Sequence, residues 1–118
     1  MNKEELKKRT KAFAHKCVKM VKYLPNTYLG RHIQGQLVRC STSVAANYRA
    51  ACRSQSKASF IAKLSIVIEE ADESHFWIEF IMDEKLILNQ EISELLSEAD
   101  QLTAIFVSSR KTARKNLS

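Results

Sequence analysis

Apolar residues recur every three or four positions along most of this chain, a spacing typical of helices that bury one face. The pattern predicts helices over about residues 3–23, 27–53 and 57–84, with a further helix starting near Asn89. The predicted core positions, in chain order, are Leu6, Thr10, Phe13, Cys17, Met20 and Leu24; Leu29, Ile33, Leu37, Cys40, Val44, Tyr48 and Ala51; Phe60, Leu64, Val67, Ala71, Ile78 and Ile81; and Ile92, Leu95, Leu96, Ala99, Leu102 and Phe106.

Residues that end or begin helices separate these segments. Pro25 disfavours helical geometry at the residue before it, and the side chain of Asn26 or Thr27 can cap the helix that follows. Residues 54–56 and Asn89 supply similar capping signals. Short connections make consecutive helices antiparallel, so the sequence predicts an all-α, up-down-up-down four-helix bundle.

Length and composition narrow the possibilities further. A chain of 118 residues has room for a single domain, 1–118, and two glycines with one proline are too few turn residues for a β-sandwich or barrel. No apolar run approaches the roughly 20 residues that span a bilayer, and no apolar leader follows the first residues, which predicts a cytoplasmic protein with no membrane partner. The three widely spaced cysteines are interpreted as reduced thiols of the core.

Charge is distributed unevenly along the chain. Residues 1–63 carry fourteen basic and two acidic side chains, whereas residues 64–100 carry one lysine and eleven carboxylates. A row of basic side chains lies opposite the core stripe of the first helix and forms a ridge that is either a solvated face or a phosphate-contacting surface. The candidate nucleic-acid contacts are Lys8, Lys11, Lys19 and Lys22, with Arg31 as an extension. No aromatic residue interleaves with these lysines, so base stacking is not expected.

Large apolar side chains also occur on the outer side of the third predicted helix. They are Ile66, Phe76, Trp77 and Phe80, which a monomeric bundle would present to water. Aromatic side chains rimmed by charge are typical of protein interfaces, so these residues are candidates for a contact between subunits. A broad intramolecular core is the alternative.

A polar row flanks the core on the second helix and faces acidic residues of the third. The row consists of Gln36, Arg39, Ser43 and Asn47, and the carboxylates are Glu69 and Glu73. Carboxylates near an apolar seam need cationic partners, and arginines of the second helix can supply them. We therefore predict a structural polar network, either within one subunit or between two.

Catalytic signatures are missing from the sequence. Asp72 and His75 are spaced like half of a di-metal site in a bundle, but no second such pair occurs. There is no glycine-rich phosphate loop and no nucleophile elbow. The sequence therefore predicts a protein that is not an enzyme, with no catalytic residue, metal or cofactor.

Residues 36–51, Gln-Leu-Val-Arg-Cys-Ser-Thr-Ser-Val-Ala-Ala-Asn-Tyr-Arg-Ala-Ala, carry a family resemblance that continues through residues 60–64, residues 69–74 and Trp77. The chain resembles the four-helix bundle proteins related to those encoded in intervening sequences of bacterial large-subunit (23S) rRNA genes. The resemblance implies a bacterial, cytoplasmic bundle that assembles into a ring, with a homopentamer as the best-known arrangement. It also implies no catalytic residues, and the family's biochemical role is unsettled.

A related branch comprises the accessory (variability determinant) proteins of retroelements, which are basic rings that engage nucleic acid and a reverse transcriptase. Combining resemblance and charge, we predict a non-enzymatic ring-like homo-oligomer that binds RNA or DNA through its basic first helix, with a protein such as a reverse transcriptase as a further partner. The alternative is a protein-interaction scaffold or adaptor that binds no nucleic acid.

Overall fold

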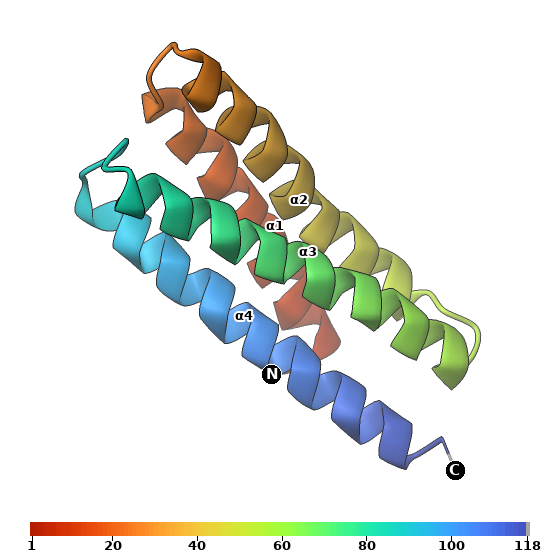
Figure 1. The fold of residues 1–118 in the computed structure, drawn as a ribbon. Helices are drawn as coiled ribbons and strands as arrows, with labels where there is room; N and C mark the ends of the chain where they lie inside the picture. Colours follow the sequence, from red (N-terminus) through yellow and green to blue (C-terminus); the bar gives the residue numbers. More distant parts are fainter. Residues whose placement is uncertain (118) are drawn as a thin grey trace.

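A computed structural model describes residues 1–117 and shows four helices joined by short turns (Figure 1). Helix α1 spans Lys3–Met20 and continues into the 3-10 turn η1, Val21–Tyr23. The other helices are α2, Tyr28–Cys52, α3, Lys57–Asp83, and α4, Gln90–Lys115. Consecutive helices run in opposite directions, so the predicted all-α up-down bundle is confirmed.

Each helix is preceded by a residue whose side chain accepts a hydrogen bond from a backbone N–H in the first turn. The donor-to-acceptor distances are 2.8 to 3.1 Å. These bonds satisfy N–H groups that have no partner inside the helix. The capping residues are Asn2, Thr27, Ser56 and Asn89, the last three as predicted.

The core contains every residue that the hydrophobic pattern assigned to it. Of the predicted set, only Leu24, Leu29, Phe60 and Leu96 are half-buried rather than buried. Among residues 1–117, the buried threonine and serine side chains Thr10, Ser41 and Ser74 lie among the apolar side chains, and each donates to a backbone carbonyl three or four residues earlier in its own helix. Because these hydroxyls are hydrogen-bonded, they are accommodated without the cost of an unpaired polar group.

The helices differ in length and in how closely they pack. Helix α2 packs against both α1 and α3, whereas α1 and α4 make the least contact of any neighbouring pair. Helix α1 has 18 residues, whereas the other helices have 25 to 27. The C-terminal end of α4 therefore extends beyond the N-terminal end of α1 (Figure 1). The α1–α4 seam is therefore the most open side of the bundle.

A bidentate ion pair joins α1 and α4 across this open seam. The guanidinium of Arg9 donates to both carboxylate oxygens of Glu98 at 2.7 Å, and also to Gln101 Oε1 at 2.9 Å. Both charged side chains are largely buried, and hydrogen bonding to Glu98 raises the pKa of Arg9. Parallel N–H···O bonds of this kind are the strong form of an ion pair, so Arg9 links α1 to α4 where apolar packing is thin.

The three cysteines are free thiols, as predicted for a reduced core. Cys17 and Cys40 are buried and Cys52 is half-buried. Burial raises the pKa of the Cys17 thiol to about 12 and also raises the pKa of Cys40. Since the thiolate is the reactive form, these two side chains are unreactive at neutral pH. None of the helices in residues 1–117 is both long and apolar enough to cross a membrane.

Candidate nucleic-acid interface

Folding gathers the carboxylate-poor first half of the chain onto one side of the bundle. Between Glu5 and Glu69 the sequence contains no carboxylate, so α1 beyond its first turn and all of α2 are free of acidic residues. The remaining acidic residues lie on α3, on α4 or in the turn between them. Because α1 packs beside α2 (Figure 1), these two helices form one continuous basic side.

A shallow groove of about 590 Å³ follows the seam between α1 and α2 on this basic side. Its basic lining residues are Lys7, Lys8, Lys11, His15 and Arg49. The other lining residues are Ala14, Val18, Thr42, Ala45 and Ala46, which are small or apolar, and Glu4. The small side chains of α2 beside the basic wall of α1 leave room for an elongated polyanion to lie along the seam.

The lysines of this groove differ in whether their charge is already paired with a carboxylate. Lys7 Nζ lies 2.7 Å from a carboxylate oxygen of Glu4, and this hydrogen bond lowers the pKa of Glu4. Lys8 and Lys11 are exposed and form no salt bridge with any residue in the described range. Their charges are therefore available to a ligand.

The predicted row of nucleic-acid contacts is divided between two grooves. Lys8 and Lys11 line the α1–α2 groove, whereas Lys19 and Lys22 line a second groove of about 760 Å³ between α1 and α4. Lys8 and Lys19 are separated by roughly 17 Å along the axis of α1 at 1.5 Å per residue. The opposite wall of the second groove is acidic and contains Glu91, Glu94 and Glu98. The structure thus brings Lys8 and Lys11 together on a positive surface and places Lys19 and Lys22 in a mixed one.

Arg31 lies apart from both grooves, at the end of the bundle formed by the α1–α2 turn. Its guanidinium is exposed and donates to Asn26 Oδ1 at 3.0 Å. Sequence reasoning did not assign Lys7 or Arg49 to the basic surface. Arg49 could be placed there only once α1 and α2 were known to pack with this register.

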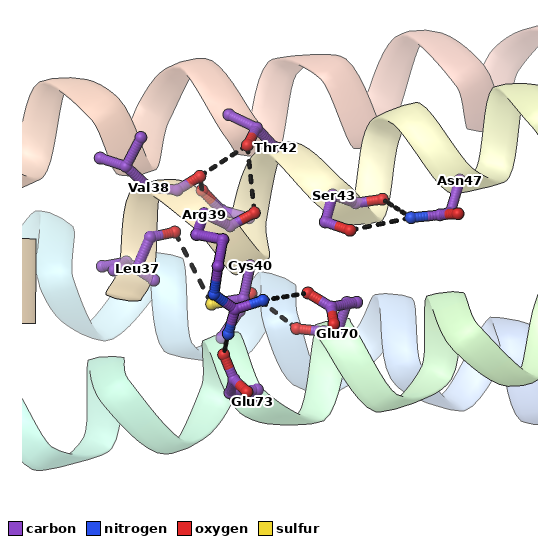
Figure 2. Close-up of polar contacts among 11 residues, drawn as sticks. Leu37, Val38, Arg39, Cys40, Thr42, Ser43, Asn47, Glu70 and Glu73 are labelled. Carbon is purple, nitrogen blue, oxygen red and sulfur yellow. Dashed lines mark hydrogen bonds and ion pairs between the residues drawn. The ribbon is translucent and has the colours of Figure 1, made fainter. Parts of the chain in front are cut away.

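The predicted polar network between α2 and α3 is partly present. Arg39 forms ion pairs with Glu73, as expected, and with Glu70 at 3.2 Å, both within one chain (Figure 2). Glu69 is exposed and forms no salt bridge with the residues described here. Exposure separates the two residues: Glu70 is 19% exposed and lies on the side of α3 that faces Arg39, whereas Glu69 is turned toward solvent.

The rest of the polar row is not connected to this ion pair. Asn47 Nδ2 donates to Ser43 Oγ at 2.8 Å and to the Ser43 carbonyl oxygen at 3.0 Å, along the same helix (Figure 2). Gln36 is half-buried and has no hydrogen bond to a described residue. The row is therefore not one continuous network, because only the long arginine side chain reaches α3.

Replacing Arg39 with alanine should destabilise the protein by about 1 kcal/mol, measured by thermal unfolding. The Arg39 side chain is 49% exposed, so solvent weakens the ion pairs, but Glu70 is only 19% exposed and would lose its partner. Arg53→Ala removes an exposed arginine that forms no salt bridge with a described residue, and should leave the melting temperature nearly unchanged. Equal melting temperatures for the two variants would contradict a stabilising role for the Arg39 pairs.

The four apolar residues predicted on the outer side of α3 differ in exposure. Phe76 is 50% exposed and Ile66 is 39% exposed, as expected. Trp77 and Phe80, however, are half-buried and pack against the core, so the prediction that they face water is wrong for these two. Their rings reach around α3 to its neighbours, since side chains of this size extend well beyond the strict core stripe. A role for the four residues in a subunit interface stays a prediction.

Trp77 is the centre of an aromatic cluster. Its ring centroid lies 5.0 Å from Phe76, 6.0 Å from Phe80 and 5.5 Å from His32 of α2. The indole Nε1 is buried and has no hydrogen-bond partner among the residues described. Sequence reasoning missed His32, because its proximity to Trp77 depends on how α2 and α3 pack.

Within residues 1–117, no group of three or more His, Cys, Asp or Glu side chains is placed so that it could hold a metal ion.

The chain is similar to a known protein family and to a protein of known structure. Residues 2–108 match the sequence profile of the family described as 23S rRNA-intervening sequence protein. The crystal structure of a protein of unknown function from the S23 ribosomal protein family of Bacteroides thetaiotaomicron superposes with a TM-score of 0.84 at 29% sequence identity. The alignment covers 94% of this chain and 99% of that protein. No curated protein matches this chain.

Proposed function

This chain belongs to the 23S rRNA-intervening sequence protein family, and from that premise we propose that it is a non-enzymatic, oligomeric bundle protein that binds RNA or other nucleic acid through the α1–α2 groove. The observation that carries the proposal is the group of basic side chains along that groove, in which Lys8 and Lys11 of α1 form no salt bridge with a described residue and Arg49 of α2 lines the same groove. Phosphate contacts of this kind provide affinity without reading sequence.

The groove suits a phosphate backbone better than the other surfaces do. Lys8 and Lys11 are three residues apart on one helix face, so their ammonium groups can contact successive phosphates of one strand. Arg49 approaches the same groove from α2. Lys19 and Lys22 face carboxylates across the second groove and contribute less, because the nearby negative charge repels a polyanion.

A salt titration of purified protein with a structured RNA and with a single strand of equal length tests this proposal. Each phosphate contact releases counterions, so the logarithm of the binding constant should fall linearly with the logarithm of salt concentration. Replacing both Lys8 and Lys11 with glutamine should weaken binding to every RNA and reduce the slope by roughly 0.7 to 0.9 per lysine.

A matched control distinguishes binding in the α1–α2 groove from an effect of the protein's overall charge. Lys63→Gln with Lys85→Gln removes the same number of positive charges from α3 and the turn after it, outside the groove. This variant should keep the salt slope of the unmodified protein. Equal losses for the two double variants would contradict binding in the α1–α2 groove, and no binding at low salt would contradict the proposed function as a whole.

Self-association is part of the same proposal. Phe76 and Ile66 are exposed apolar residues of α3, and exposed aromatic side chains are enriched in protein interfaces. The resemblance noted above makes a homopentameric ring the expected assembly. The basic α1–α2 side is complementary to the carboxylates of α3 and of the first half of α4, which favours contact between different faces of adjacent subunits. The second half of α4 is basic.

One observation favours a second candidate function, that of a protein-interaction scaffold. The α1–α4 groove places Lys16, Lys19 and Lys22 opposite three glutamates, with Met20 and Leu95 also among its lining residues. Opposite charges on facing walls suit a helix of a partner protein, whose own charges can match both sides. A protein that binds no nucleic acid yet loses a partner when the exposed lining residues Lys19 and Glu94 are changed would support this function instead.

A further inference from the structure

Exposed aromatic rings stack at the end of the bundle where α1 turns into α2. Tyr28, the first residue of α2, is 79% exposed, and its ring lies nearly parallel to that of His32, with centroids 6.3 Å apart and an interplanar angle of 15°. The His32 ring contacts Trp77 edge-on at 5.5 Å. A series of ring contacts therefore runs from the half-buried indole to the surface and ends at Tyr28.

Positive charge accompanies this stack. Arg31 and His32 follow Tyr28 by three and four residues, so both side chains are its neighbours on the helix surface. The bond from Arg31 to Asn26 Oδ1 holds the guanidinium against the turn. Lys22 is exposed just before the turn, and α2 contains no carboxylate. One of the predicted nucleic-acid contacts, Arg31, thus lies beside an exposed ring, whereas Lys22 lines the groove that faces the glutamates of α4.

This arrangement changes the expectation drawn from the linear sequence. No aromatic residue interleaves with the lysines of α1, but the fold adds the α2 residues Tyr28 and His32 to the end of the basic side. Proteins that bind single-stranded nucleic acid commonly place aromatic side chains beside basic ones, because a base stacks on the ring while a cation contacts the phosphate. The Tyr28 ring is pre-positioned by its stacking on His32, which lowers the entropy lost on binding.

We propose that an unpaired nucleotide base stacks on Tyr28 while Arg31 contacts its backbone, giving the protein a preference for single-stranded over double-stranded nucleic acid. The inference rests on the proposed function, since the α1–α2 groove supplies the general affinity and Tyr28 adds the preference. Bases inside a duplex are already stacked on one another, so they gain nothing from the tyrosine ring.

The test compares a single strand and a duplex of equal length, each carrying one 2-aminopurine, a base whose fluorescence falls when it stacks on an aromatic ring. The unmodified protein should quench the single strand and bind it more tightly than the duplex. Tyr28→Ala should lower affinity for the single strand by about ten-fold, remove the quenching and leave duplex affinity unchanged. Tyr28→Phe keeps the ring and should behave like the unmodified protein.

Tyr23→Ala is the matched control, because Tyr23 is 66% exposed at the same turn and has no ring contact with a described residue. It should leave single-strand affinity within two-fold of the starting value. The protein has one tryptophan, Trp77, so its emission gives an independent readout of binding near His32.

The outcomes distinguish this inference from the proposed function. No binding to either nucleic acid would overturn both. Tight binding to both that Tyr28→Ala leaves unchanged would overturn base stacking alone and keep the α1–α2 groove. A fall in assembled mass for Tyr28→Ala, with single-strand affinity unchanged, would identify the ring stack as a contact between subunits and overturn the inference.

Discussion

Replacing Gly30 with alanine should destabilise the bundle by about 3 kcal/mol, whereas the same change at Gly35 should stabilise it by about 0.5 to 1 kcal/mol. Gly30 is buried in the first turn of α2, under the α1–α2 turn. A Cβ atom at this position would lie 1.9 Å from the carbonyl oxygen of Pro25 and 3.0 Å from its carbonyl carbon. Both are backbone atoms, so the turn itself must move to relieve the overlap.

Gly35 is the matched control because it lies on the same helix with nothing within 4 Å of an added Cβ. Alanine there gains helix propensity without a clash, which accounts for the opposite sign. Denaturant unfolding followed by circular dichroism measures both free energies. Equal stability of Gly30→Ala and the unmodified protein would contradict the tight packing of the turn on α2.

The Gly30 variant also bears on function. The turn contains Asn26, which holds Arg31, and it adjoins Tyr28. A shifted turn should therefore weaken single-strand binding in addition to lowering stability, while Gly35→Ala should leave binding unchanged.

Replacing Phe76 with glutamate should dissociate the proposed assembly into monomers of 13.5 kDa. Phe76 is 50% exposed in the single chain, so the substitution removes little from the core and the monomer should stay folded. In an assembled interface the same carboxylate would be desolvated without a partner, which costs several kcal/mol by order of magnitude. Light scattering measures the mass, and circular dichroism checks that the helices are retained.

Val107→Glu is the control for this experiment. Val107 is a 42% exposed apolar residue of α4, outside the aromatic cluster around Trp77. Its replacement should leave the assembled mass unchanged. Trp77→Glu and Phe80→Glu are poorer tests, because both side chains pack against the core and their loss would lower stability as well. An unaltered mass for Phe76→Glu would exclude Phe76 from any interface.

Helix positions and core residues were predictable from the sequence because their causes are local. The spacing of apolar residues places Leu6, Phe13 and Cys17 on one face of α1 whatever the helix packs against. Capping by Thr27 and Asn89 involves backbone groups only three residues away. The predicted bounds of α2, α3 and the start of α4 accordingly lie within one residue of those observed.

Features that join different helices were not predictable to the same degree. The sequence pointed to Arg39 and Glu73, but whether Glu69 or Glu70 completes the ion pairs depends on the rotation of α3 relative to α2. The link from Arg9 to Glu98 joins residues 89 positions apart and carries no local signal.

The sequence by itself determined four helices, their capped ends, their buried stripes and a positive charge on the first half of the chain, because periodicity and composition act through near neighbours. Only the tertiary structure decided which basic residues share a groove, that Trp77 is half-buried, and that Tyr28 and His32 bring aromatic rings to the basic side. Those outcomes depend on the rotation and register of one packed helix against the next, which are set jointly by the side chains of both helices.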